Sequence, residues 1–169
     1  MPWFGAESDH GKRGDLPVNQ FRKWSVSASF QRPVTDRVRW LTSAYAQWSP
    51  DRLHGVEQLS LGGESSVRGF KEQYISGNNG GYLRNELSWS LFSLPYVGTV
   101  RAVPALDGGW LHSGRDDPYS SGTLWGAAAG LSTTSGHVSG SFTAGLPLVY
   151  PDWLAPDHLT VYWRVAVAF

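Results

Sequence analysis

Apolar and polar residues alternate along much of this chain with the two-residue period of a β-strand. In the stretch 37–48, for example, Val38, Trp40 and Trp48 share one face, while arginine, serine, tyrosine and glutamine occupy the other. The final stretch alternates without interruption. We predict seven strands, at residues 21–31, 37–48, 81–92, 98–111, 122–132, 136–147 and 159–169.

The lengths of these strands and of their connections favour a membrane barrel over a soluble sheet. Strands near ten residues are long enough to cross a bilayer and exceed the five or six that are usual in soluble proteins. Short turns alternate along the chain with long polar loops, as they do in outer-membrane barrels. The short turns are 32–36, 93–98 and 132–136, and the long loops are 49–80, 111–121 and 147–158. The predicted fold class is therefore all-β, an antiparallel transmembrane β-barrel segment.

Aromatic residues support this interpretation, because most of them fall near strand ends or on the apolar faces, as in interfacial girdles. They include Trp40, Trp48, Trp89, Trp110, Trp125, Tyr150, Trp153 and Trp163. Mean hydropathy is −0.28 and no run of 18 apolar residues occurs, so no transmembrane helix is predicted. Asn85 interrupts the apolar face of its strand.

Charge and cysteine content exclude several classes of partner and site. The net charge is zero, which provides no electrostatic footprint for nucleic acid. Cysteine is absent, so neither a disulfide framework nor a cysteine-ligated metal site is expected. The five histidines lack metal-ligand spacing, and neither a nucleophile elbow nor a phosphate-binding loop is present. We expect no catalytic, cofactor or metal site, and the acidic pair at 116–117 is interpreted as solvated.

The loop 49–80 contains a hairpin that organises the rest of the chain. Its glycines, including Gly69, can adopt backbone angles that are closed to other residues. One cation, Arg68, stands between two apolar residues, Val67 and Phe70. A long loop with this core is predicted to be ordered and functional.

The Val67-Arg68-Gly69-Phe70 motif, preceded by Leu-Gly-Gly-Glu-Ser-Ser and followed by an Arg-Asn-Glu-Leu strand, resembles the sixth extracellular loop of the Omp85 superfamily. Within it the chain is most similar to the two-partner secretion transporters, the haemolysin secretion/activation family of ShlB, FhaC and HecB. The resemblance runs from about residue 20 to the end. It implies a Gram-negative outer-membrane protein that exports one large haemolysin- or adhesin-like exoprotein through a β-barrel pore.

The resemblance also implies a partner for the loop arginine. Ala105-Leu-Asp-Gly-Gly109 is similar to a Phe/Gly-x-Asp-x-Gly motif on a barrel strand of the same superfamily, although Ala105 departs from its first position. In that family the loop folds into the barrel, and its arginine meets the aspartate, here Asp107. The alternation separately places Asp107 on the polar face, and Gly109 would leave room for the loop.

Family barrels have about sixteen strands, and seven cannot close around a pore whose edges must all be paired. The whole chain, 1–169, is therefore interpreted as the C-terminal portion of the barrel domain, a fragment without POTRA domains. Phe169 resembles the C-terminal signal read by the barrel-assembly machinery. The expected partners are the secreted exoprotein, outer-membrane lipid and that machinery. Two alternatives stay open: an Omp85-type assembly factor (an insertase), and a soluble carbohydrate-binding β-sandwich.

Overall fold

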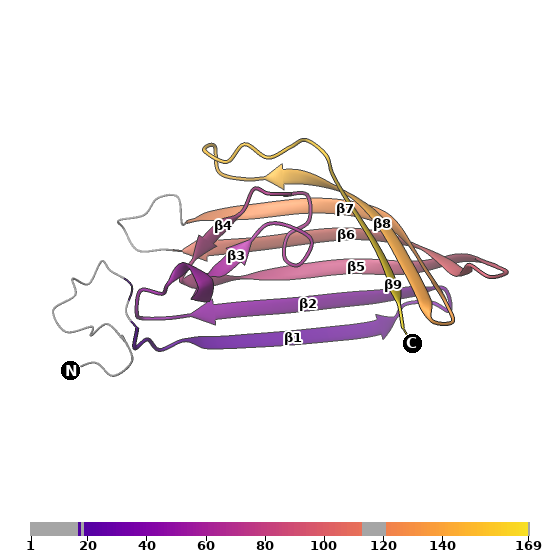
Figure 1. Ribbon diagram of the computed structural model, residues 1–169, viewed down its shortest axis with the longest axis horizontal. Coiled ribbons are helices and arrows are strands. Elements are labelled where there is room, and N and C mark those ends of the chain that lie inside the picture. Colours follow the sequence, from indigo (N-terminus) through magenta and orange to yellow (C-terminus); the bar gives the residue numbers. More distant parts are fainter. Residues whose placement is uncertain (1–16, 18, 113–120, 169) are drawn as a thin grey trace.

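A single antiparallel sheet makes up most of the structure, which is a computed structural model describing residues 17, 19–112 and 121–168 (Figure 1). Its spatial order is β1-β2-β5-β6-β7-β8-β9, so each long strand pairs with the next one along the chain. The strands are β1 (Trp24–Pro33), β2 (Val38–Trp48), β5 (Asn79–Leu94), β6 (Gly98–His112), β7 (Gly122–Ser135), β8 (Val138–Val149) and β9 (Thr160–Val167). This arrangement confirms the predicted partial barrel: the sheet is curved and open, with β1 and β9 at its two edges.

The two ends of the sheet differ in the connections they carry. The short turns after β1, β5 and β7 gather at one end, on the right of Figure 1, which we call the turn end. The long loop after β2 and the segment after β8 begin at the other end, which we call the loop end. Among the described residues, no helix is long and apolar enough to span a membrane.

The outer face of the sheet, opposite to the loop that follows β2, carries the apolar half of the alternation. Its large side chains are uncovered, and the exposed fraction is 68% for Val26, 51% for Trp89 and 76% for Trp163. Aromatic pairs form across strands, with 4.9 Å between the ring centroids of Trp24 and Trp48. An apolar face without cover is typical of a surface that faces lipid.

Asn85, the residue that interrupts this apolar face, has its side-chain oxygen bonded within the sheet. The Thr42 hydroxyl lies 2.8 Å from the Asn85 side-chain oxygen and 3.0 Å from the Arg84 carbonyl oxygen. Thr42 and Asn85 are register partners on β2 and β5. The interruption is therefore a cross-strand hydrogen-bonded pair, and the strand continues through it.

The inner face is covered by the loop between β2 and β5. This loop contains a short 3-10 helix, η2 (Gly55–Glu57), and two short strands, β3 (Leu59–Leu61) and β4 (Ile75–Gly77), which pair with each other. The sequence predicted a hairpin in this loop, but not its 3-10 helix or its two short strands. The hydrophobic core lies between this loop and the sheet, and it comprises Leu59, Leu61, Val67, Phe70, Ile75, Leu111, Leu124 and Leu154.

Strand limits differ from those predicted mainly at the ends. The first strand begins at Trp24 instead of Phe21, because Trp24 pairs with Trp48, the last residue of β2. At its other end β1 runs through Arg32 and Pro33, which the sequence analysis assigned to a turn. Proline is tolerated there because Pro33 is the terminal residue of an edge strand.

Candidate functional site

The centre of the site is the segment between β3 and β4, residues 62–74, which we call the hairpin. Three of its glycines have backbone conformations that other residues rarely adopt. Gly62, Gly63 and Gly69 have φ of +120°, +103° and +104°. The Gly63 amide donates to the Val67 carbonyl at 3.0 Å, and the Gly62 amide donates to the Ser66 hydroxyl at 3.0 Å. These bonds close the turn and present the next residue, Arg68, to the sheet.

Two apolar residues of the motif anchor the hairpin in the core. Val67 and Phe70 are both 0% exposed. The Phe70 ring packs edge-on against Tyr150, which follows β8, with 6.2 Å between the ring centroids. Burying two such side chains contributes about 1.5–3 kcal/mol each, which holds the hairpin against the inner face.

Arg68 reaches Asp107 on β6 from this anchored position. Its Nε donates to Asp107 Oδ2 at 2.6 Å and its Nη2 donates to Oδ1 at 2.8 Å, in a bidentate pair. The Arg68 backbone amide donates to the same Oδ2 at 3.2 Å. Asp107 is 0% exposed and Arg68 5%, so the pair is withdrawn from water.

A second carboxylate, Glu86 on β5, completes the surroundings of the guanidinium. Arg68 Nη1 donates to Glu86 Oε2 at 2.9 Å. Burial alone would lower the pKa of Arg68, but its hydrogen bonds to Asp107 and Glu86 raise that pKa, so the guanidinium stays charged. Glu86 is the glutamate of the Arg-Asn-Glu-Leu strand, and no role was predicted for it from the sequence.

Arg84, the register partner of Asp107 on β5, supports the hairpin from one side. Its Nη1 lies 3.3 Å from the Ser65 carbonyl oxygen, and its buried Nε has no hydrogen-bond partner in the structure. At the outer rim of the hairpin, Glu64 forms an exposed ion pair with Arg164 on β9, 3.1 Å apart. The hairpin is therefore held to β5, β6 and β9 by polar groups.

The backbone of the hairpin lies directly on glycines of the sheet. A Cβ at Gly126 on β7 would overlap the Arg68 carbonyl oxygen, and one at Gly145 on β8 would lie 2.7 Å from the Gly69 amide nitrogen. Gly109, which was predicted to leave room for the loop, lies against another residue of that loop: its Cβ would lie 2.9 Å from the Leu61 side chain. Gly126 and Gly145 were missed from the sequence, although both fall at inward positions of glycine-containing strands.

Other predicted features lie outside the described residues or show no grouping. Phe169, the predicted assembly signal, and the acidic pair at 116–117 belong to the part of the chain that the structure does not describe. Within residues 17, 19–112 and 121–168, no three His, Cys, Asp or Glu side chains gather closely enough to hold a metal ion. What the site can do is mechanical: it fixes a loop inside the curve of the sheet.

Comparison with known proteins places this geometry in a family. Residues 1–133 match the family described as haemolysin secretion/activation protein ShlB/FhaC/HecB. The outer membrane transporter CdiB of Escherichia coli O6:K15:H31 is 98% identical over 169 residues, which is 100% of this chain and 29% of that protein. The CdiB of Dickeya dadantii is 47% identical over 99% of this chain and 30% of its own length, and the hemolysin transporter ShlB of Serratia marcescens is 38% identical over 79% and 23%.

Solved structures agree with the sequence relatives. CdiB from Escherichia coli superposes with a TM-score of 0.91 at 97% identity, covering 100% of this chain and 32% of that chain. CdiB from Acinetobacter baumannii gives a TM-score of 0.71 at 25% identity, covering 88% and 28%. The present chain thus spans less than one third of the length of these curated relatives and structures.

Proposed function

Because this chain belongs to the haemolysin secretion/activation family ShlB/FhaC/HecB, a family of the Gram-negative outer membrane, we propose that it supplies the arginine-loop part of a two-partner secretion transporter. In this proposal residues 1–169 are the C-terminal portion of the barrel domain. The remaining strands come from the rest of a longer protein, and the complete barrel exports one large haemolysin- or adhesin-like exoprotein.

The single observation that carries the proposal is the hairpin fixed on the inner face by Arg68 and Asp107. The docked hairpin lies on the inner face of the sheet, which is the side that becomes the lumen when the barrel closes. Arg68 is held there by two carboxylates and by the buried neighbours Val67 and Phe70. In the proposed mechanism the loop and the polar inner wall together shape the path of the exported chain.

The inner face beside the hairpin has the polar character that such a path requires. A recess of about 300 Å³ lies between the loop that follows β2 and the strands β2 and β5, and Lys23, Gln47, Gln58, Ser65 and Tyr82 are among the residues that line it. An extended polypeptide can exchange hydrogen bonds with these groups as it passes, and no nucleotide is needed. The apolar outer face would at the same time contact outer-membrane lipid.

The two other interpretations have less support. An Omp85-type assembly factor would also use an arginine loop, but the matched family is described by secretion and activation. A soluble carbohydrate-binding sandwich would need a second sheet over the apolar face, and the described residues leave that face uncovered.

The proposal is tested by deleting the gene for the complete protein that contains this segment and by restoring it on a plasmid. We expect the partner exoprotein to disappear from the medium and to return on complementation, while unrelated outer-membrane proteins assemble normally. Loss of many outer-membrane proteins would favour the insertase, and unchanged secretion would refute the transporter.

A further inference from the structure

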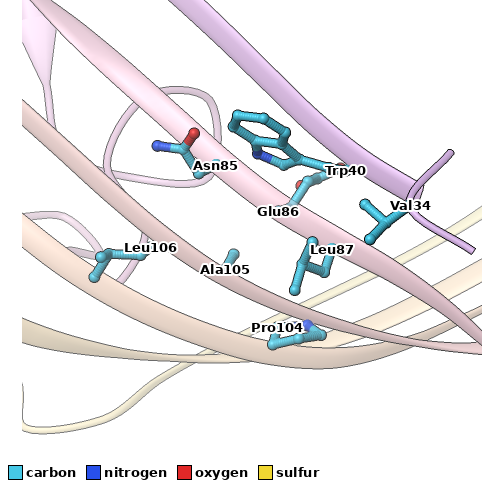
Figure 2. Close-up of a pocket in the computed structure, with 8 residues that line it drawn as sticks. All are labelled: Val34, Trp40, Asn85, Glu86, Leu87, Pro104, Ala105 and Leu106. Atoms are coloured by element: carbon cyan, nitrogen blue, oxygen red, sulfur yellow. The ribbon is translucent and has the colours of Figure 1, made fainter. Parts of the chain in front are cut away.

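The outer face carries an apolar groove that the proposed function does not use. The groove has a volume of about 640 Å³, and the residues that line it include Val34, Trp40, Asn85, Leu87, Pro104 and Leu106. Figure 2 shows its walls on three neighbouring segments: β2 and the turn before it, β5, and β6. Pockets of this volume accommodate small molecules or parts of lipids.

The groove lies where the pairing between β5 and β6 is interrupted. Glu86 pairs with Ala105 and Trp89 pairs with Ala102, but the two positions between them on each strand have no partner across this pair of strands. The same positions still pair with β2 and β7 on their other sides. Pro104 falls in this gap and has no N–H to donate to a neighbouring strand. The interrupted ladder thus coincides with the groove.

One charged side chain of the outer face belongs to a residue that pairs with Trp40, a residue of the groove wall. Arg32, at the turn end of β1, is the register partner of Trp40 and is exposed. Of the outward positions on the strands described by the structure, Arg32 is the one that carries a Lys, Arg, Asp or Glu. The alternation puts it on the same face as Phe30 and Trp40, whose rings pack edge-on with 5.9 Å between their centroids.

From this juxtaposition we propose that the groove binds one phospholipid of the membrane leaflet at the turn end, with an acyl chain in the groove and the phosphate against Arg32. The inference rests on the proposed outer-membrane setting, in which short turns mark the periplasmic side. Basic side chains beside apolar grooves at this depth recognise anionic headgroups, while the apolar walls receive the chain. The Thr42 hydroxyl lies 2.8 Å from the Asn85 side-chain oxygen, so that oxygen is bonded within the sheet.

Native mass spectrometry of the complete transporter provides the test, with phosphatidylglycerol added as the probe after purification in mild detergent. Wild type should retain one phospholipid. Arg32→Ala should lower its occupancy about five-fold, the equivalent of about 1 kcal/mol for one headgroup contact. Leu87→Trp, which fills the groove without touching the charge, should lower it as well.

The matched control is Arg39→Ala, which removes the same charge near the same turn but from the inward-facing side of β2. It should leave lipid retention unchanged. Equal lipid retention by wild type, Arg32→Ala and Leu87→Trp would show only annular lipid and overturn the proposal, as would a second barrel or another polypeptide in place of the lipid. Secretion is assayed separately, so failure of lipid binding with intact export would sink this inference alone.

Discussion

Arg68 and Asp107 are 39 residues apart in sequence, yet three hydrogen bonds join them: two from the guanidinium and one from the Arg68 backbone amide. Because the backbone amide takes part, the aspartate fixes the path of the loop as well as the arginine side chain. Both residues are buried, so neither can replace its partner with water at no cost.

Replacing Asp107 with asparagine should therefore release the hairpin. The change keeps the shape of the side chain but removes its negative charge and one of its two acceptor oxygens, which leaves Glu86 as the carboxylate partner of Arg68; breaking a buried pair costs about 3–5 kcal/mol. Hydrogen exchange at residues 62–74 of the complete transporter in lipid nanodiscs should accelerate. Glu64→Gln is the control, because its exposed ion pair with Arg164 contributes about 0–1 kcal/mol. Equal exchange in both variants would contradict the assignment.

Glu86→Gln should have a smaller effect than Asp107→Asn. Glu86 accepts one hydrogen bond from Arg68, and its side chain keeps 24% exposure, so water can replace part of the interaction. A hydrogen bond to a charged group contributes about 1.5–3 kcal/mol. The same exchange measurement should rank the variants as wild type, Glu86→Gln and then Asp107→Asn, from slowest to fastest. The reverse order would mean that Glu86 is the principal partner.

Gly126→Ala should displace the hairpin without altering any charge. A Cβ there overlaps the Arg68 carbonyl oxygen. Because one atom is a Cβ and the other belongs to the main chain, the overlap can be relieved only if the backbone of the hairpin or of β7 shifts. We expect loss of secretion with the barrel still inserted, judged by its heat-modifiable mobility on gels. Gly140→Ala on β8 is the control, since its Cβ would make ordinary contacts at 3.7 and 3.9 Å. Normal secretion by Gly126→Ala would show that the hairpin need not stay docked.

The segment just before β1 should lose its attachment to Asp51 when that carboxylate is protonated in acid. Arg22 lies just before β1, and its hydrogen bonds lower the pKa of the Asp51 carboxyl. A lowered pKa means that the tie is fully present above the ordinary aspartate pKa of about 3.9 and is lost as pH falls through the lowered value. At pH 6 the Arg22 amide should exchange faster in Asp51→Asn than in wild type, and in acid the difference should vanish once the Asp51 carboxyl is protonated. A difference that persists in acid would exclude the carboxylate as the cause.

How far the sequence alone predicts this structure depends on how local each feature is. Strand alternation is a local property, so the seven strands and their outward faces, such as that of Trp163, could be predicted from it. Arg68 and Asp107 could be linked in advance through a family resemblance. The glycines beneath the hairpin could not, because only the folded geometry shows that Gly126 faces the Arg68 carbonyl. Arg32 was assigned to a turn because a proline follows it, and its place beside the groove appears only when β1 is paired with β2.

The central claim is that Arg68 and Asp107 act as one unit to hold the loop for export. Its most direct test is a double-mutant cycle on secretion by the complete transporter, with Arg68→Ala, Asp107→Ala and the combination measured at equal barrel levels in the outer membrane. We predict that each single variant impairs export and that the double variant is no worse than either. Losses that add together would contradict the claim.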